Sequence, residues 1–343
     1  MAKKLTRAAV AAAAMAGSLI SVPGAVSPRD LGDHNTPGEI YLANESRFGE
    51  QYFSEPLTTY LVGWKDPSNI EATLDFIAPP VQAPGRLFEF KQYLNAEEFL
   101  SETDDVRGIG ADFKRVEYQA KDQQAKTINK GLTIRLDHDQ YPDITLATQQ
   151  ATARLWRRLC RNELRRAVTA LVTAAGSPTA KTWNTTAGLD PDQDVITARI
   201  GAADTSGISP NRLIYNEIAW NKRGLSHRAQ NTAGGYASAT LSIDQVAQLA
   251  GMDKGMVSKE RYQVSSTTKA KILGDYVIGF YGEDGAQLED PTNLKRFYSP
   301  VEGGGKMRVY VQVINSKFTD VTVEHYSNVI SPTNLGMFIL AIS

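Results

Sequence analysis

The chain has 343 residues, of which 42% are apolar and 22% are charged, and a length of this order predicts about two globular domains. Its 37 basic and 38 acidic residues leave a net charge of −1, which disfavours a general nucleic-acid coat with a basic surface. The single cysteine, Cys160, excludes an intrachain disulfide framework and a cysteine-rich metal site. No run of 18 apolar residues indicates a membrane span.

The N-terminal stretch of the chain resembles a secretory signal. Lys3, Lys4 and Arg7 form a basic start, residues 8–22 form an apolar stretch, and residues 24–26 are small. Most of the apolar stretch is alanine, so the same residues also fit an alanine-rich amphipathic arm. At this point both interpretations stay open.

Two runs of alternating polarity, residues 86–93 and 113–120, predict strands that are joined by a long charged tip. The tip, residues 95–112, holds six acidic residues and one base, Arg107, for a net charge of −5. We therefore expect an extended hairpin with an acidic end. The candidate acidic residues of this tip are Glu97, Glu98, Glu102, Asp104 and Asp105.

A long helix is predicted from Thr145 to Ala175, with Asp143 or Thr145 as its cap and Gly176 and Pro178 as its end. Helical spacing places one apolar stripe along it, made of Trp156, Leu159, Cys160, Leu164, Ala167 and Leu171. Five arginines fall on the opposite face and are the candidates for a subunit interface or a DNA-facing surface: Arg154, Arg157, Arg158, Arg161 and Arg165.

The predicted helix carries six arginines and one acidic residue, Glu163, for a net charge of +5. An exposed arginine face needs an anionic partner or water. Glu163 falls within the apolar stripe, and we expect it to be a buried, paired carboxylate, because an unpaired buried carboxylate is costly.

The rest of the chain predicts a mixture of helices and strands, which indicates an α+β fold. Residues 177–206 have the composition of a loop. Helices are expected from Pro210 to about Gln230 and from Ser242, and strands at residues 276–281, 307–314, 318–325 and 337–342.

Catalytic and metal-binding patterns are weak, and the sequence predicts no catalytic residue, no metal site and no cofactor. No G-x-S-x-G or Walker pattern is present. Ser226 and His227 are adjacent on a helix, where their side chains diverge. The aspartates at positions 190, 192 and 194 resemble the start of a calcium loop, but Val195 and Gly201 replace its central glycine and terminal glutamate.

Residues 241–260 resemble the helix-turn-helix of small repressors. Gly255 interrupts the candidate second helix, and the remaining chain stays unexplained. Sequence-specific DNA binding is therefore disfavoured.

The succession of arm, projecting hairpin, long helix with an internal glutamate, helix-rich insert and returning strands resembles the major capsid proteins of tailed bacteriophages, which have the Hong Kong 97-type fold. The likeness runs through residues 86–135, the helix 145–175, the segment from Pro210 to Trp220, the segment 241–277 and the strands 307–342.

The resemblance implies four parts of the chain. Residues 1–60 would be an N-terminal arm, residues 86–135 an extended hairpin loop, and residues 206–306 an axial domain. Residues 61–85, 136–205 and 307–343 would form a peripheral domain around the spine helix 145–175.

The resemblance also implies a mechanical function without catalysis. Copies of the chain would assemble into hexamers and pentamers of an icosahedral shell around double-stranded phage DNA, with which contact is non-specific. Scaffolding, portal and decoration proteins are the other implied partners, and no membrane is implied. The location would be the virion, assembled in the bacterial cytoplasm. An encapsulin-like nanocompartment shell and a secreted binding protein with an N-terminal signal are the alternatives.

Overall fold

A computed structural model of the chain describes residues 52–64, 69–93, 106, 112, 121–265, 267–287, 290–300 and 306–343. The chain divides into two units, Met1–Tyr52 and Phe53–Ser343, and every described helix and strand belongs to the second. The signal-like stretch, most of the predicted arm, the predicted strand 113–120 and nearly all of the acidic tip lie outside the described residues.

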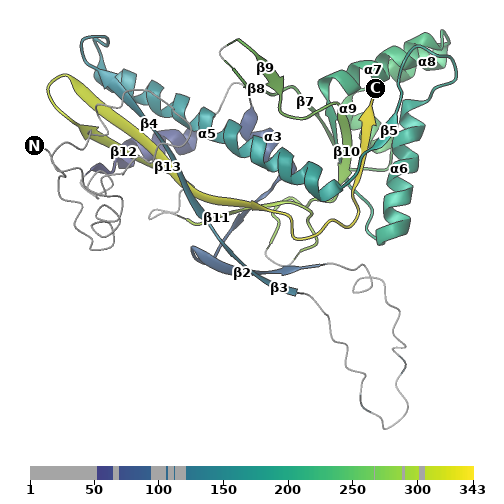
Figure 1. Ribbon diagram of the computed structural model, residues 1–343, viewed down its shortest axis with the longest axis horizontal. Helices are drawn as coiled ribbons and strands as arrows, with labels where there is room; N and C mark the ends of the chain where they lie inside the picture. Colours follow the sequence, from purple (N-terminus) through teal and green to yellow (C-terminus); the bar gives the residue numbers. More distant parts are fainter. Residues whose placement is uncertain are drawn as a thin grey trace, which may run out of the picture. The chain divides into compact units, whose positions relative to one another are not determined.

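The described elements include both helices and strands, and the last eight of them are all strands (Figure 1). The helices are α2 (Glu55–Gly63), α3 (Ile70–Ile77), α5 (Ile144–Ala175), α6 (Pro191–Ser206), α7 (Glu217–Ala229), α8 (Ala233–Ala239) and α9 (Ile243–Leu249). The strands are β1 (Pro80–Gln82), β2 (Leu87–Gln92), β3 (Lys121–Lys126), β4 (Ile128–Asp137), β5 (Thr179–Lys181), β6 (Arg212–Asn216), β7 (Lys254–Ser258), β8 (Arg261–Gln263), β9 (Lys269–Lys271), β10 (Tyr276–Phe280), β11 (Lys295–Tyr298), β12 (Arg308–Val313), β13 (Phe318–Ile330) and β14 (Phe338–Ile342). This confirms a mixed helix and sheet protein.

The first sheet is organised around β13, its longest strand. One edge of β13 pairs antiparallel with β4, from Phe318 opposite Asp137 to Ser327 opposite Ile128. Its other edge pairs with β12 and then with β11, and β1 joins β11 in parallel. Because alternate residues of a strand face opposite sides, Val321 and Val323 of β13 point together into the core, where both are fully buried.

Helix α5 lies along the first sheet and supplies most of the main hydrophobic core (Figure 1). Its apolar stripe is buried as the spacing predicts, and it packs with Leu74 and Ile77 of α3 as well as with β13. Burial of each such large apolar side chain contributes about 1.5–3 kcal/mol, so this contact fixes the helix on the sheet.

The second sheet has the strand order β5-β14-β10-β6-β7. Both faces of β6 are covered, because Ile214 belongs to the core around α5 while Leu213 and Tyr215 pack among α6, α7 and α9. The expectation of a helix from Pro210 is therefore wrong over β6. The run is apolar because the strand is central and buried on both sides, and α7 begins only after Asn216.

The loop expected at residues 177–206 is also corrected, since it contains β5 and the 16-residue helix α6. Asp190 caps α6 and Pro191 occupies its first turn. The helix carries no continuous apolar stripe, so its periodicity gave no signal.

The predicted strand at residues 86–93 is present as β2. It pairs with β3, and its Phe88 and Phe90 pack against Phe297 of β11, with ring centroids 4.7 and 5.9 Å apart. Among the helices of the described residues, none combines the length and hydrophobicity that a membrane span needs.

Candidate functional site

Helix α5 presents the predicted arginine face. Asp143 caps the helix, because its carboxylate accepts hydrogen bonds from the backbone N–H groups of Thr145 (2.9 Å) and Leu146 (3.1 Å). Gly176 ends it with a φ of 78°. At about 1.5 Å per residue, its 32 residues span about 48 Å, and the five arginines occupy about 17 Å of that length.

The five arginines of this face have different surroundings. Arg154, Arg158 and Arg165 are exposed, whereas Arg157 and Arg161 are half-buried. The guanidinium of Arg157 lies 5.4 Å from the ring centroid of Trp64, and that of Arg165 lies 4.1 Å from the ring centroid of Tyr262.

Two of the five arginines thus stack on aromatic rings of their own chain. Neither Arg154 nor Arg158 forms an ion pair with another described residue, and both stay directed to the surface.

Glu163 lies on the opposite side of α5, inside the core, and is 2% exposed. Its carboxylate accepts hydrogen bonds from Lys130 Nζ of β4 (2.8 Å), Arg166 of α5 (2.5 Å) and Ser327 Oγ of β13 (3.1 Å). His325 Nε2 of β13 is 3.7 Å away. The carboxylate therefore connects the helix to two strands of the first sheet.

The charge of this buried group is stabilised by its neighbours. Burial alone raises the pKa of Glu163, but the nearby His325 imidazole and the charge and hydrogen bond of Lys130 outweigh burial and lower that pKa well below its usual range. Burial lowers the pKa of Lys130 against the opposing attraction of Glu163. We conclude that Glu163 is ionised in the folded protein at neutral pH.

A second cationic surface is a groove of about 770 Å³ beside the second sheet. Residues of α7, α8, β7 and the β8–β9 hairpin line it. We call it the basic groove, because five of its lining side chains are basic: Arg223, Arg228, Lys259, Arg261 and Lys271. Local sequence patterns do not predict this groove, because Arg223 and Arg228 come close to the β8–β9 hairpin only through the tertiary fold.

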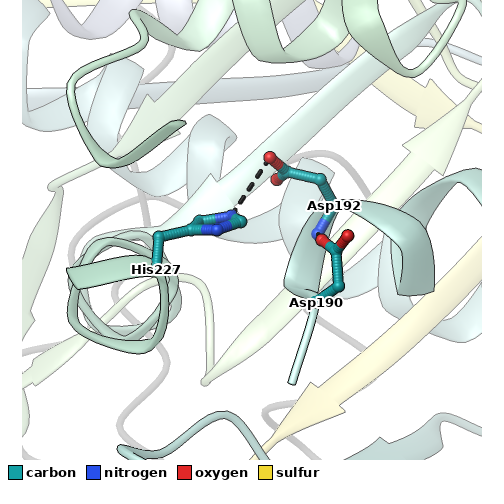
Figure 2. A group of neighbouring side chains, drawn as sticks. All are labelled: Asp190, Asp192 and His227. Atoms are coloured by element: carbon teal, nitrogen blue, oxygen red, sulfur yellow. Dashed lines mark hydrogen bonds and ion pairs between the residues drawn. The ribbon is translucent and has the colours of Figure 1, made fainter. Parts of the chain in front are cut away.

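Asp190, Asp192 and His227 form a cluster with metal-ligand chemistry near this groove (Figure 2). The two carboxylate oxygens of Asp192 accept hydrogen bonds from Arg223 at 2.6 and 2.7 Å, and His227 Nε2 lies 3.1 Å from one of them. Asp190 caps α6. A guanidinium already satisfies Asp192, so the cluster is explained as a buried ion pair without a metal.

The sequence contains two further candidate sites, the three aspartates at positions 190, 192 and 194 and the adjacent Ser226 and His227. The fold does not assemble either of them. Asp194 turns away from its neighbours to bind Lys181 Nζ (2.7 Å) and Trp183 Nε1 (3.0 Å), so the three aspartates do not converge. Ser226 Oγ has no hydrogen-bond partner among the described residues, so it lacks a contact with a general base.

The resemblance of residues 241–260 to a helix-turn-helix is not realised. The first helix is present as α9, but the candidate second helix is the strand β7, which pairs in parallel with β6. Gly255 within it approaches Ile243 so closely that an added Cβ would lie 2.6 Å from the Ile243 carbonyl oxygen.

No known protein-family model matches the chain, and no curated protein matches it. Solved structures share its architecture, among them the following two. A phage-related protein from Bordetella bronchiseptica superposes with a TM-score of 0.61 at 18% identity, covering 84% of this chain and 96% of the other. A protein described as the capsid protein of an Escherichia coli prophage superposes with a TM-score of 0.50 at 12% identity, covering 85% and 99%.

The chain has the fold of phage capsid proteins. At identities of 18% and 12% the likeness concerns backbone architecture, so the charged side chains described above are features of this chain itself.

Proposed function

We propose that this chain is a major capsid protein. Copies assemble into the hexamers and pentamers of an icosahedral shell that encloses double-stranded phage DNA. The role is structural and non-catalytic, and it belongs to the virion, with assembly in the bacterial host cytoplasm.

The observation that carries the proposal is the extent of the fold match. The superposition spans 84% of this chain and 96% of the phage-related protein, so it concerns nearly the whole of that protein and not a shared substructure. The order of elements in the sequence supports the same function independently.

In this proposal the architecture is of the Hong Kong 97 type. Helix α5 is the spine helix, and the first sheet with α5 forms the peripheral domain. The second sheet with α7, α8 and α9 lies in the axial domain over residues 206–306. The ribbon of β2 and β3 is the base of the extended loop 86–135, and residues 1–60 form the N-terminal arm.

The arginine face of α5 supports assembly in this scheme. Arg154 and Arg158 have no carboxylate partner among the described residues, so they remain available to a neighbouring subunit or to packaged DNA. Single exposed ion pairs are weak, but many identical pairs act together in a shell. Scaffolding, portal and decoration proteins would complete the particle.

Electron microscopy of the purified full chain tests the function. We expect closed particles tens of nanometres wide. A persistent monomer under all salt and pH conditions would contradict a shell function. Particles from the natural source that hold enzyme cargo and no nuclease-protected DNA would instead identify an encapsulin-like compartment.

A further inference from the structure

A small cavity lies between α5 and the strands β11 and β13 of the first sheet. Its volume is about 10 Å³, which is room for one particle of about the size of a water molecule. Its lining includes Trp156 and Glu163 of α5, Arg296 of β11, His325 of β13, and Lys306 just before β12. The first four side chains are buried and Lys306 is half-buried, so the cavity is largely shielded from solvent.

His325 is a buried polar side chain whose hydrogen-bonding groups are unsatisfied. It is 5% exposed, and neither Nδ1 nor Nε2 forms a hydrogen bond with another described residue. Nε2 lies 3.7 Å from Glu163 Oε1, which is beyond hydrogen-bond distance. The Trp156 ring packs against the imidazole in a T-shaped arrangement, with ring centroids 5.7 Å apart. Because either tautomer of a neutral histidine carries an N–H donor, this buried ring favours a ligand that accepts a hydrogen bond.

The Glu163 carboxylate in the lining does not compensate the cations around it. Glu163 pairs with Lys130 at 2.8 Å and with Arg166 at 2.5 Å, so two positive charges face one negative charge. Burial lowers the pKa of Lys130, and the charges of Arg166 and Arg296 lower it further against the attraction of Glu163. Those two repulsions indicate that positive charge predominates around the carboxylate.

Two further cations border the cavity. The Arg296 guanidinium pairs with Asp75 at 2.6 Å through Nη2, and a guanidinium has further N–H donors beyond that nitrogen. The Lys306 ammonium lies 5.8 Å from the centroid of the Tyr298 ring and forms no ion pair with another described residue. Four cationic side chains and two carboxylates thus meet here, and they leave a net charge of +2 beside the cavity.

We propose that this cavity binds one monatomic anion, chloride, between α5, β11 and β13. The ion accepts a hydrogen bond from the His325 imidazole and faces the charges of Arg296 and Lys306. A carboxylate or a phosphate group is too large for a cavity of this volume, whereas chloride is only slightly larger than a water molecule. A metal cation is disfavoured by the surplus of positive charge.

The inference does not depend on the shell function, because it concerns the interior of one subunit. A ligand that binds the folded chain and not the unfolded chain stabilises the fold by mass action. We therefore expect chloride to stabilise the subunit beyond the general effect of salt, by adding a link between the helix and the first sheet.

Thermal melting of the full chain in sodium chloride and in sodium gluconate tests the site, at pH 7 and equal ionic strength. Gluconate carries the same charge but is too large for the cavity. We expect the Tm to be about 2 °C higher in chloride at a concentration roughly tenfold above the Kd. The difference should level off as the site fills, because one site binds one ion.

Two variants with matched controls locate the effect. His325→Phe keeps an aromatic ring against Trp156 but removes both nitrogens, and it should abolish the difference in Tm between the two salts. Lys306→Gln removes a half-buried charge and should weaken chloride binding roughly tenfold. His138→Phe and Lys317→Gln change the same residue types outside the cavity lining, and they should keep the full difference. If His325→Phe does not fold, Lys306→Gln decides.

Bromide can replace chloride and show where the ion lies. In crystals grown in sodium bromide, we expect an anomalous scattering peak within hydrogen-bond distance of His325. Three outcomes would overturn the proposal. They are an equal Tm of the unaltered chain in chloride and gluconate, a difference in Tm that survives in both cavity variants, and a water molecule at the position expected for bromide.

Discussion

Glu163 is a carboxylate held in a hydrophobic core by partners from three elements. Removing a charge from water is expensive, and the energy is recovered here through short hydrogen bonds to Lys130, Arg166 and Ser327. Because the three partners lie on β4, α5 and β13, the carboxylate also fixes how the helix is placed along the strands. A group of this kind is best tested by removing its charge while keeping its shape.

Glu163→Gln should lower the free energy of unfolding at pH 7 by about 3–5 kcal/mol, because it leaves the Lys130 ammonium without its partner. The pKa of Glu163 is lower in the folded state than its unfolded value of about 4.3. Its stabilisation is therefore present at neutral pH and is lost as the pH falls below about 5 through the depressed folded pKa. Urea denaturation of both proteins from pH 7 to pH 3 should show their difference shrinking.

Asp139→Asn is the control for this prediction. Asp139 pairs with Lys317 on the surface, where the side chains are 69% and 64% exposed, and an exposed pair contributes little. Its stability should stay within about 0.5 kcal/mol of the unaltered protein at neutral pH. Equal stability of the Glu163→Gln variant and the unaltered protein at pH 7 would contradict the role assigned to the buried carboxylate.

At the scale of elements, α5 is the long helix and β13 the long strand of the structure, and neighbouring elements pack against both. The helix is rich in arginine and is amphipathic, so its termini and its apolar stripe determine where it begins, ends and packs. The strand β13 is long because β4 pairs with one of its edges and β12 and β11 share the other. Each element is thus specified locally but stabilised by distant segments.

The N-terminal cap of α5 provides a test at this scale. Asp143→Ala removes the acceptor for the Thr145 and Leu146 N–H groups and should lower the free energy of unfolding by about 1 kcal/mol. Asp143→Asn keeps a side-chain acceptor and should lose much less. If both variants lose the same amount in denaturant titrations, the side chain does not act as the cap.

At the scale of the whole molecule, a net charge of −1 conceals segments of opposite charge. Residues 95–112 carry −5, the segment 145–175 carries +5, and the basic groove carries +4. Opposite charges within each copy favour association with further copies, and ionic strength weakens that association because exposed pairs are screened. Assembly should therefore depend on charged residues that contribute little to the stability of one subunit.

Arg154→Glu combined with Arg158→Glu should abolish particles and leave folded subunits, because both side chains are exposed and form no ion pair within the described chain. Light scattering after size exclusion and electron microscopy measure particle formation, and thermal melting measures folding. Lys317→Glu, which changes a charge on an exposed turn, is the control. Intact particles from the double variant would refute a role of the arginine face in assembly.

How much could be predicted from the sequence varies between elements. Helix α5 and the strand β2 follow from periodicity, because one face of each is buried and the other is more exposed, whereas β10, β12 and β14 are short apolar runs. The strand β6 and the helix α6 could not be found in this way. The first is a five-residue run that continues directly into α7 with no turn residue between them, and the second has no apolar stripe to detect.

The same limit applies to the functional surfaces. The arginine face was predicted because residues three and four apart share one side of a helix. The basic groove was not, since it brings Arg228 of α7 to Lys259 after β7, and only the pairing of β7 with β6 puts them on one surface. Local spacing determines which residues lie on one face of an element, so the sequence alone determined the charged helix and the acidic segment. The tertiary structure decided which faces meet, because contacts between distant segments depend on how the two sheets pack.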